Sequence, residues 1–265
     1  MKQKKRAEKN LGKRKFSLKE FALTKIILFI SLFVIIMGLL LIVIASLRDI
    51  EPFGIDFGWS LIYLGIILSA IYFIIEGKPF LKSWDFMKNA KNYIWFATIL
   101  FFLLALIGFL FPIFFQQQIY DLIRELLKQT EGLNVWNMIR FIFINNLKSS
   151  FFAIFCGILF GIIPFAVLVI NGYVLGFVAN KTIASEGALI LWRLFPHGIF
   201  ELPAVLISIG IGLRLGMFLF VYKEKNKLRE FGKWLIDSLR VFVLIIIPLL
   251  VIAAIIEGSL MIFLG

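Results

Sequence analysis

Residues 26–47 read IILFISLFVIIMGLLLIVIASL, and the charged residues Lys25 and Arg48 stand on either side of this run. A helix needs about 20 apolar residues to cross a hydrocarbon layer about 30 Å thick, and this run has 22 residues without a charge. A cleaved signal peptide has an apolar region of only about 7–15 residues, followed by a small-residue cleavage site. The run therefore predicts a retained transmembrane helix.

Four further stretches of the chain are also free of charged residues: 57–75, 93–115, 149–180 and 241–256. Hydrophobic residues make up 61% of the 265 residues and charged residues 17%, against about 45–50% and about 25% in soluble domains. A globule of this size could not bury that much apolar surface, which excludes a soluble enzyme. We expect an all-α, polytopic transmembrane bundle of about 5–7 spans.

The middle of the chain does not divide into spans of ordinary length. Residues 149–180 form 32 residues without a charge, too many for one ordinary span and few for two. Pro164 lies near the centre of this stretch, and proline removes a backbone donor from a helix. Asn171 and Gly172 follow, and glycine tolerates the left-handed conformation that a helix end requires. We therefore expect broken or re-entrant helices inside the bundle, with a helix end at Asn171-Gly172.

Lysine and arginine are concentrated in segments that the positive-inside rule assigns to the cytoplasm. Residues 1–25 contain ten of them, residues 76–92 four and residues 223–233 five, whereas residues 48–56 contain one Arg and three acidic residues. We therefore expect a multi-pass protein of the cell membrane with a cytoplasmic N-terminus. Residues 117–131 alternate apolar and charged residues at helical spacing, which predicts an amphipathic helix along the outer interface.

These assignments require an odd number of crossings between residue 116 and residue 223, and two arrangements meet that requirement. The first has three crossings, near 147–168, 172–193 and 197–222. The second has one crossing and a re-entrant hairpin folded around Pro164. The sequence is compatible with both.

Charged residues inside a membrane span are costly, so they are the first candidates for function. Arg193, His197 and Glu201 follow one another at intervals of four and would share one face of a helix. Pro196 fits the first turn of that helix. The functional interpretation is a proton or cation relay facing a cavity. The structural interpretation is a polar cluster, including Gly198 of the same motif, that holds broken helices together.

Other polar and small residues have both functional and structural interpretations. Glu257 lies in the last span and could meet Arg193 or Arg214, or reach the outer interface. Asn145 and Asn146 are typical of a helix cap. Pairs of small residues four apart let helix backbones approach closely, within one chain or between the copies of a homo-oligomer. The pairs in the middle of the chain are Gly157 with Gly161 and Gly172 with Gly176.

The sequence has no motif for a nucleotide phosphate, a serine nucleophile or a zinc protease. One His and one Cys cannot supply a typical zinc site, so we expect no metal, no cofactor and no enzymatic activity. The net charge of +12 is explained by topology. The polyanion nearest to the basic segments is the anionic lipid bilayer. We expect no nucleic-acid partner.

The motifs together resemble the stage II sporulation protein M family of integral membrane proteins. The resemblance covers residues 88–264, preceded by a basic tail at 1–25 and a transmembrane hairpin at 26–76 that lie outside it. Its residues are Asn145-Asn146, Phe155-x-Gly157, Gly161, Pro164, Asn171-Gly172, Gly176, Pro196-His197-Gly198-Ile199-Phe200-Glu201 and Ala253-Ala254-x-x-Glu257.

The resemblance implies a membrane scaffold, because the family's founding member holds enzymes that remodel peptidoglycan during sporulation. Relatives also occur in organisms that neither sporulate nor have peptidoglycan, so the fold is the firmer implication. Our first hypothesis is a non-catalytic protein that recruits membrane or envelope partner proteins. The second is a transporter for a small solute or ion, with Arg193, His197 and Glu201 along its path. A water-sized cavity reaching Glu201 would favour transport, and a dry, packed motif would favour the scaffold.

Overall fold

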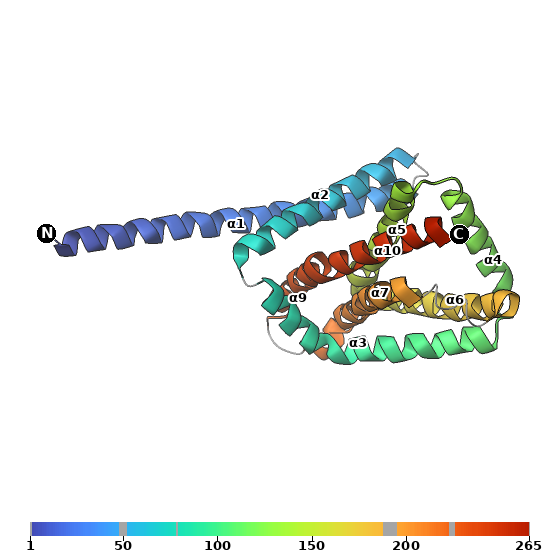
Figure 1. Cartoon of the computed structure of the whole chain (residues 1–265). Helices are drawn as coiled ribbons and strands as arrows, with labels where there is room; N and C mark the ends of the chain where they lie inside the picture. The colour runs from blue at the N-terminus through green and yellow to red at the C-terminus, as the bar shows by residue number, and fades with distance from the viewer. Residues whose placement is uncertain (1, 48–51, 78, 188–194, 223–225, 265) are drawn as a thin grey trace. The chain divides into compact units, whose positions relative to one another are not determined.

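The computed structural model describes residues 2–47, 52–77, 79–187, 195–222 and 226–264, and it contains helices without strands across those residues. The α-helices are α1 (Lys2–Leu47), α2 (Pro52–Glu76), α3 (Pro79–Leu110), α4 (Gln116–Thr130), α5 (Val135–Phe155), α6 (Ile162–Glu186), α7 (Phe195–Gly216), α8 (Phe218–Val221), α9 (Lys227–Val241) and α10 (Ile247–Leu264) (Figure 1). Within the described residues, seven helical segments are long and apolar enough to cross a membrane. The predicted all-α polytopic fold is confirmed.

The chain divides into two compact units, residues 1–81 and residues 82–265. In the first unit, α1 and α2 pack side by side as a hairpin (Figure 1). Small residues form the seam between them: a Cβ atom on Gly38 would lie 2.6 Å from the carbonyl oxygen of Gly58. Ser31 and Ser69 are fully buried there, and both hydroxyl groups lie 2.9 Å from the carbonyl oxygen of Gly65. These hydrogen bonds satisfy the two hydroxyl groups, which would find no hydrogen-bond partner among lipid chains.

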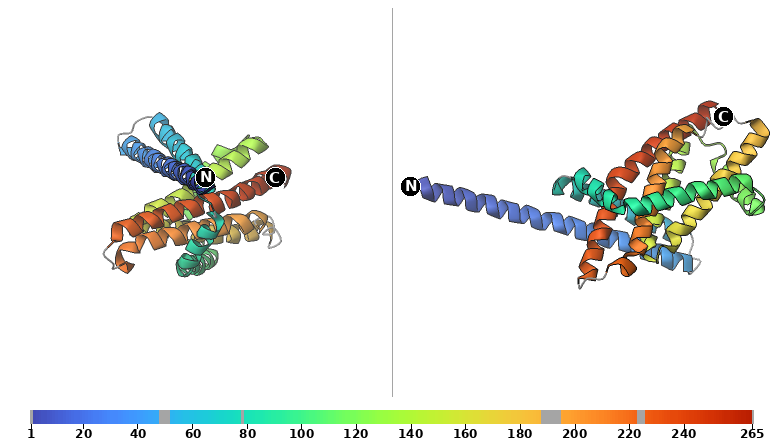
Figure 2. Two further views of the ribbon diagram at one scale, coloured as in Figure 1. Left: turned by 90° about the vertical axis from the view of Figure 1, so that its left-hand side faces the viewer. Right: turned by 90° about the horizontal axis from the view of Figure 1, so that it is seen from below.

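In the second unit, α7 is the central helix, because it packs against α5, α6 and α10 (Figures 1 and 2). Its buried residues Val205, Leu206, Ile209 and Leu213 join Phe101 of α3, Ala153 of α5 and Leu168 of α6 in one hydrophobic core. More than half of the α7 span is buried inside the protein. More than half of the side chains along this helix therefore face protein rather than lipid.

Glycines bring the helix backbones of the second unit into direct contact. A Cβ atom on Gly212 of α7 would lie closer than 3.0 Å to the carbonyl oxygen of Ala153, and one on Gly157 would meet Gly212 in the same way. Gly176 of α6 makes an equally close approach to the carbonyl oxygen of Ala105 on α3. Such separations are possible only without a side chain, as in other membrane helix pairs with small residues.

The break in the middle of the chain lies earlier than the sequence predicted. The chain turns at a 3₁₀ segment (Cys156–Ile158) and at Gly161, whose φ of 74° is in the left-handed region. Pro164 is buried in the first turn of α6, where proline is tolerated, so it is not the tip of a re-entrant hairpin. The expected helix end at Asn171-Gly172 was wrong, because α6 continues through it.

Helix packing and local hydrogen bonding account for this correction. The side chain of Asn171 donates to the carbonyl oxygen of Val167 one turn earlier (2.7 Å), so it is satisfied within an intact helix. Gly172 instead lets α6 approach Leu104 and the carbonyl oxygen of Phe101 on α3. The three helices α5, α6 and α7 fit the number of crossings in the three-crossing arrangement. Their candidate spans are Val135–Ile158, Ile162–Glu186 and Gly198–Gly216, so the first two begin earlier than the expected residues 147 and 172.

Two other boundaries differ from the charge-free runs of the sequence. Helix α3 begins at Pro79, within the basic segment 76–92, and ends at Leu110 rather than at residue 115. The last apolar segment continues from the charged helix α9 through a π-helical turn (Phe242–Ile246) into α10. Helix α4 forms where the amphipathic segment was predicted, and Ile119 on its apolar face packs with Tyr173 and Phe177 of α6.

Candidate functional site

Two carboxyl groups from distant parts of the chain meet inside the second unit. Glu201 lies in the second turn of α7, and Glu257 lies just past the middle of α10. The two side chains lie next to each other, and the side chain of Asn146 on α5 lies beside Glu201. We call Glu201, Glu257 and Asn146 the carboxyl cluster. It joins the three helices that pack around one another at this end of the bundle.

Each residue of the carboxyl cluster lies on the buried face of its helix. Glu201 precedes Ala204, which is 0% exposed, by one turn. Glu257 follows Ala253, also 0% exposed, by one turn. The small residues of α10 then let it approach α5, since a Cβ atom on Gly258 would lie 3.0 Å from the backbone nitrogen of Ile139. The helix periodicity therefore turns both carboxyl groups toward protein.

A hydrogen bond between two carboxyl groups requires a proton. Two ionised carboxylates have only acceptors, whereas a protonated carboxyl group has one O–H donor. Two negative charges side by side among apolar helices would also repel each other strongly. Carboxyl groups that lie this close in other proteins share one proton between them.

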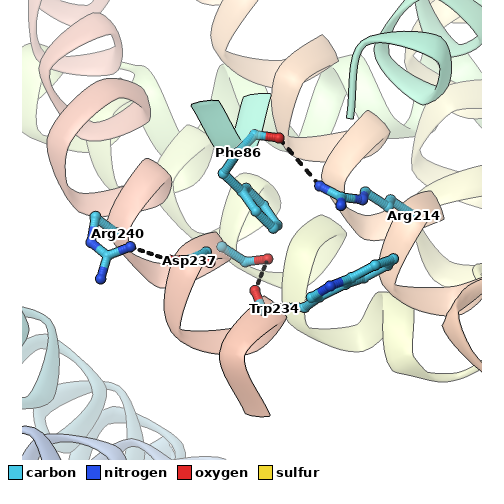
Figure 3. Close-up of polar contacts among 6 residues, drawn as sticks. Phe86, Arg214, Trp234, Asp237 and Arg240 are labelled. Atoms are coloured by element: carbon cyan, nitrogen blue, oxygen red, sulfur yellow. Dashed lines mark hydrogen bonds and ion pairs between the residues drawn. The ribbon is translucent and has the colours of Figure 1, made fainter. Parts of the chain in front are cut away.

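A second polar cluster lies at the other end of α7, about 20 Å along the helix from Glu201. Arg214 is 8% exposed and donates to the carbonyl oxygen of Phe86 on α3 (3.2 Å) (Figure 3). Its guanidinium lies 4.5 Å from the ring centre of Phe86 and 4.0 Å from that of Trp234 on α9. The guanidinium is thus held by two aromatic rings and one carbonyl group.

The neighbouring residues of α9 complete this second cluster. Arg240 is 4% exposed and forms an ion pair with Asp237 one turn before it (Figure 3). Ser238 donates to the carbonyl oxygen of Trp234 (2.7 Å) and so remains satisfied although it is buried. Phe218 packs against Trp234 with ring centres 4.9 Å apart. These contacts join the ends of α3, α7 and α9, which is a structural arrangement rather than a reactive site.

The structure therefore assigns partners that differ from those expected. The sequence allowed Glu257 to meet Arg193 or Arg214, but Glu257 meets Glu201, and Arg214 lies at the far end of α7. Arg193 lies outside the described residues. The backbone of His197 is in the first turn of α7, but its side chain is not among those described. The expected pairing of His197 with Glu201 therefore stays a prediction.

The remaining candidates have clear places in the fold. Pro196 occupies the first turn of α7, and a Cβ atom on Gly198 would lie 3.8 Å from the side chain of Leu202 of the same helix. Asn145 is exposed in the middle of α5, so neither it nor Asn146 caps a helix. The cap of α5 is Asn134, whose side chain accepts from the backbone of Asn137 (2.9 Å). Gly161 and Gly216 bring the start of α6 against the end of α7.

The described residues include no group of three His, Cys, Asp or Glu side chains that could hold a metal ion. An apolar pocket of about 490 Å³ lies between α3, α4 and α6. Its lining includes Leu104, Phe115, Ile119 and Tyr173 and does not include the carboxyl cluster.

Comparisons with known proteins agree with this description of a helical membrane protein. The family model for stage II sporulation protein M matches residues 97–260. An uncharacterised protein of Methanocaldococcus jannaschii is 28% identical over 207 residues, which cover 73% of this chain and 91% of that protein. A second uncharacterised protein of the same organism is 35% identical over 115 residues, covering 43% of this chain and 65% of that protein. No solved structure matches the chain.

Proposed function

Because the chain belongs to the stage II sporulation protein M family, we propose that it is a non-catalytic scaffold that recruits partner proteins at the cell membrane. The observation that carries this proposal is the direct contact between helix backbones. Gly212 meets Ala153, Gly176 meets Ala105, and Gly216 meets Gly161. Packed backbones cannot slide past one another without losing this contact. A bundle locked in this way offers fixed surfaces, which suits a scaffold better than a protein whose helices must move.

Affinity purification from mild detergent tests the scaffold. We expect the same partner proteins to be recovered with the tag at either end of the chain and in several gentle detergents. Reciprocal purification through a recovered partner should return this chain. An unrelated multi-pass protein from the same membrane, carrying the same tag, is the control. If no protein is enriched above that control under any condition, the scaffold proposal is wrong.

A second candidate function is a transporter for a small solute or ion, and the carboxyl cluster is the observation that favours it. Carboxyl groups inside membrane bundles are costly and are typical of proton and ion pathways. Uptake of a radiolabelled solute or a pH change inside vesicles that contain the purified protein would test this candidate. Glu201→Gln distinguishes the two functions, because a scaffold tolerates an amide of the same shape whereas proton-coupled transport needs a titratable group.

We also propose that the N-terminus and the segment before α9 face the cytoplasm. Cysteines placed at Lys5 and Lys227 are expected to resist a membrane-impermeant maleimide in intact cells and to react after lysis. A cysteine at Glu131, just after α4, is expected to react in intact cells. The reason is the excess of Lys and Arg before the first span and before the last. Labelling of Lys5 or Lys227 from outside would overturn this topology.

A further inference from the structure

We propose that the apolar pocket between α3, α4 and α6 binds one hydrocarbon chain of a membrane lipid. The pocket has a volume of about 490 Å³, within the range of about 300–1,000 Å³ that small-molecule sites occupy. The proposal goes beyond the scaffold function and rests on other residues, so either can fail without the other. It requires only that the second unit lies in a membrane, as its long apolar helices indicate.

The pocket is built around Tyr173 of α6. The hydroxyl group of Tyr173 lies 2.6 Å from the carbonyl oxygen of Phe111 and 2.8 Å from that of Phe114, so it fixes the chain that leads from α3 into α4. Phe115 follows with a φ of 56°, and its ring packs edge-on against that of Tyr173 with the ring centres 6.1 Å apart. Ile119 in the first turn of α4 also packs against Tyr173. These contacts hold the start of α4 against α6 and leave a fixed space between the three helices.

The chemistry of the lining favours a hydrocarbon ligand. Among the described side chains that line the pocket, only Gln118 and Tyr173 carry polar atoms, and the Tyr173 hydroxyl group is already engaged by two carbonyl oxygens. A polar ligand would lose its hydrogen bonds to water there and gain few in return. Water would not fill the space either, because a cavity with an apolar lining stays dry. A lipid chain needs no hydrogen bond.

The pocket opens onto the apolar outer surface of the helices. Its inner residues Ile119 and Tyr173 are 5% and 8% exposed, whereas Ile107 of α3 and Ile170 of α6 are 44% and 56% exposed at its mouth. Ile107 continues the exposed apolar face on which Leu103 lies one turn earlier. The mouth is therefore continuous with the surface that faces lipid. A chain can enter from the bilayer without passing through water.

Helix α4 gives the pocket a polar end and an apolar end. Asp121 and Arg124 form an exposed ion pair on its charged face (3.8 Å), and a helix of this kind lies at the boundary between lipid headgroups and chains. Gln118 is exposed and lines the pocket beside that boundary, so it marks the end where the headgroup stays outside. Leu104 lies about 9 Å along α3 before its end at Leu110. We therefore expect the chain to run from Gln118 toward Leu104.

Photo-crosslinking locates the chain. The full protein is reconstituted into phosphatidylcholine vesicles containing a small fraction of phosphatidylcholine that carries a diazirine on one chain, and the labelled residues are identified by mass spectrometry of its peptides. We expect labels on Ile119 and Tyr173, which lipid on the outer surface cannot reach because both are buried. Labels confined to exposed residues such as Phe102 and Leu103 would identify surface lipid only and overturn the proposal.

A tryptophan at the mouth provides the matched comparison. Ile107→Trp places a larger ring where the chain enters and should abolish the labels on Ile119 and Tyr173. Ile99→Trp is the control, because Ile99 lies two turns earlier on α3, is 59% exposed and does not line the pocket. This control should be labelled like the parent. Equal labelling of the two buried residues in both variants would overturn the proposal.

Folding of the variants is checked by their melting temperature in detergent. Ile107 and Ile99 are both exposed, so neither tryptophan enters a packed core and both variants should melt close to the parent. Ile170→Trp closes the mouth from α6 and is the second variant if Ile107→Trp does not fold. It should likewise lose the labels on the two buried residues, and retention of those labels would count against the pocket. The labelling pattern of the parent decides without any variant.

Discussion

Replacing Gly212 by alanine is expected to destabilise the bundle strongly. The new Cβ atom would lie closer than 3.0 Å to the carbonyl oxygen of Ala153, and also close to Pro164. Because the obstructing atom belongs to a helix backbone, relief requires α5 and α7 to move apart. Overpacking of this kind costs about 1–3 kcal/mol and occasionally more. The measurement is the melting temperature in detergent, together with the yield of monodisperse protein.

Gly232 is the matched control for Gly212. It lies within α9, and no other atom of the described residues is within 4 Å of the position that its Cβ would occupy. Alanine has a higher helix propensity than glycine by about 1 kcal/mol, so Gly232→Ala should be neutral or stabilising. The two substitutions add the same atom and are expected to have opposite effects. Equal stability of the two variants would show that the backbone contact at Gly212 is not as close as described.

Arg214→Ala is expected to be the most damaging substitution among the charged residues of the described chain. The change removes a guanidinium that fills the space between the rings of Phe86 and Trp234, together with a hydrogen bond to the Phe86 carbonyl group. A desolvated cation–π contact contributes about 2 kcal/mol, and the cavity left behind adds to that loss. We expect a loss of about 3 kcal/mol or more, measured by thermal or denaturant unfolding in detergent.

Arg214→Lys separates the shape of the side chain from its charge. Lysine keeps the positive charge but lacks the planar guanidinium that stacks on aromatic rings, so its stability should fall between those of the parent and the alanine variant. Arg229→Ala is the control, because Arg229 is exposed on α9, and it should change stability by no more than about 0.5 kcal/mol. A lysine variant as stable as the parent would show that charge alone holds Arg214 in place.

The positions of the spans could be predicted from the sequence because exclusion of charge from hydrocarbon is a local requirement. The runs 26–47, 57–75 and 93–115 each lie mainly within a helix long enough to cross a membrane. Helix ends were harder to predict, since a charged residue ends a membrane span but need not end the helix. The helix of the first run therefore begins far earlier, at Lys2, and that of the third at Pro79.

The break in the middle shows where local reasoning failed. Proline and an Asn-Gly pair are typical of helix ends, yet both lie inside α6. The turn occurs at Gly161, whose positive φ and contact with Gly216 of α7 depend on another helix. The small-residue pairs could be recognised in the sequence as packing positions, but the sequence did not identify the helix that each one meets.

Glu201, Glu257 and Asn146 could each be selected from the sequence, because a polar residue in an apolar span is conspicuous. Their association could not, because a residue in one helix can face any of several neighbours, and charge complementarity favoured an arginine for Glu257. The packing of Ala253 and Gly258 on α10 turns Glu257 toward the interior and brings it to Glu201 instead. Hydrophobicity is a local property of each residue in the sequence, and it determined that this chain is a helical membrane protein. The shape of the packed helices, which is a property of all of them together, decided which polar groups meet.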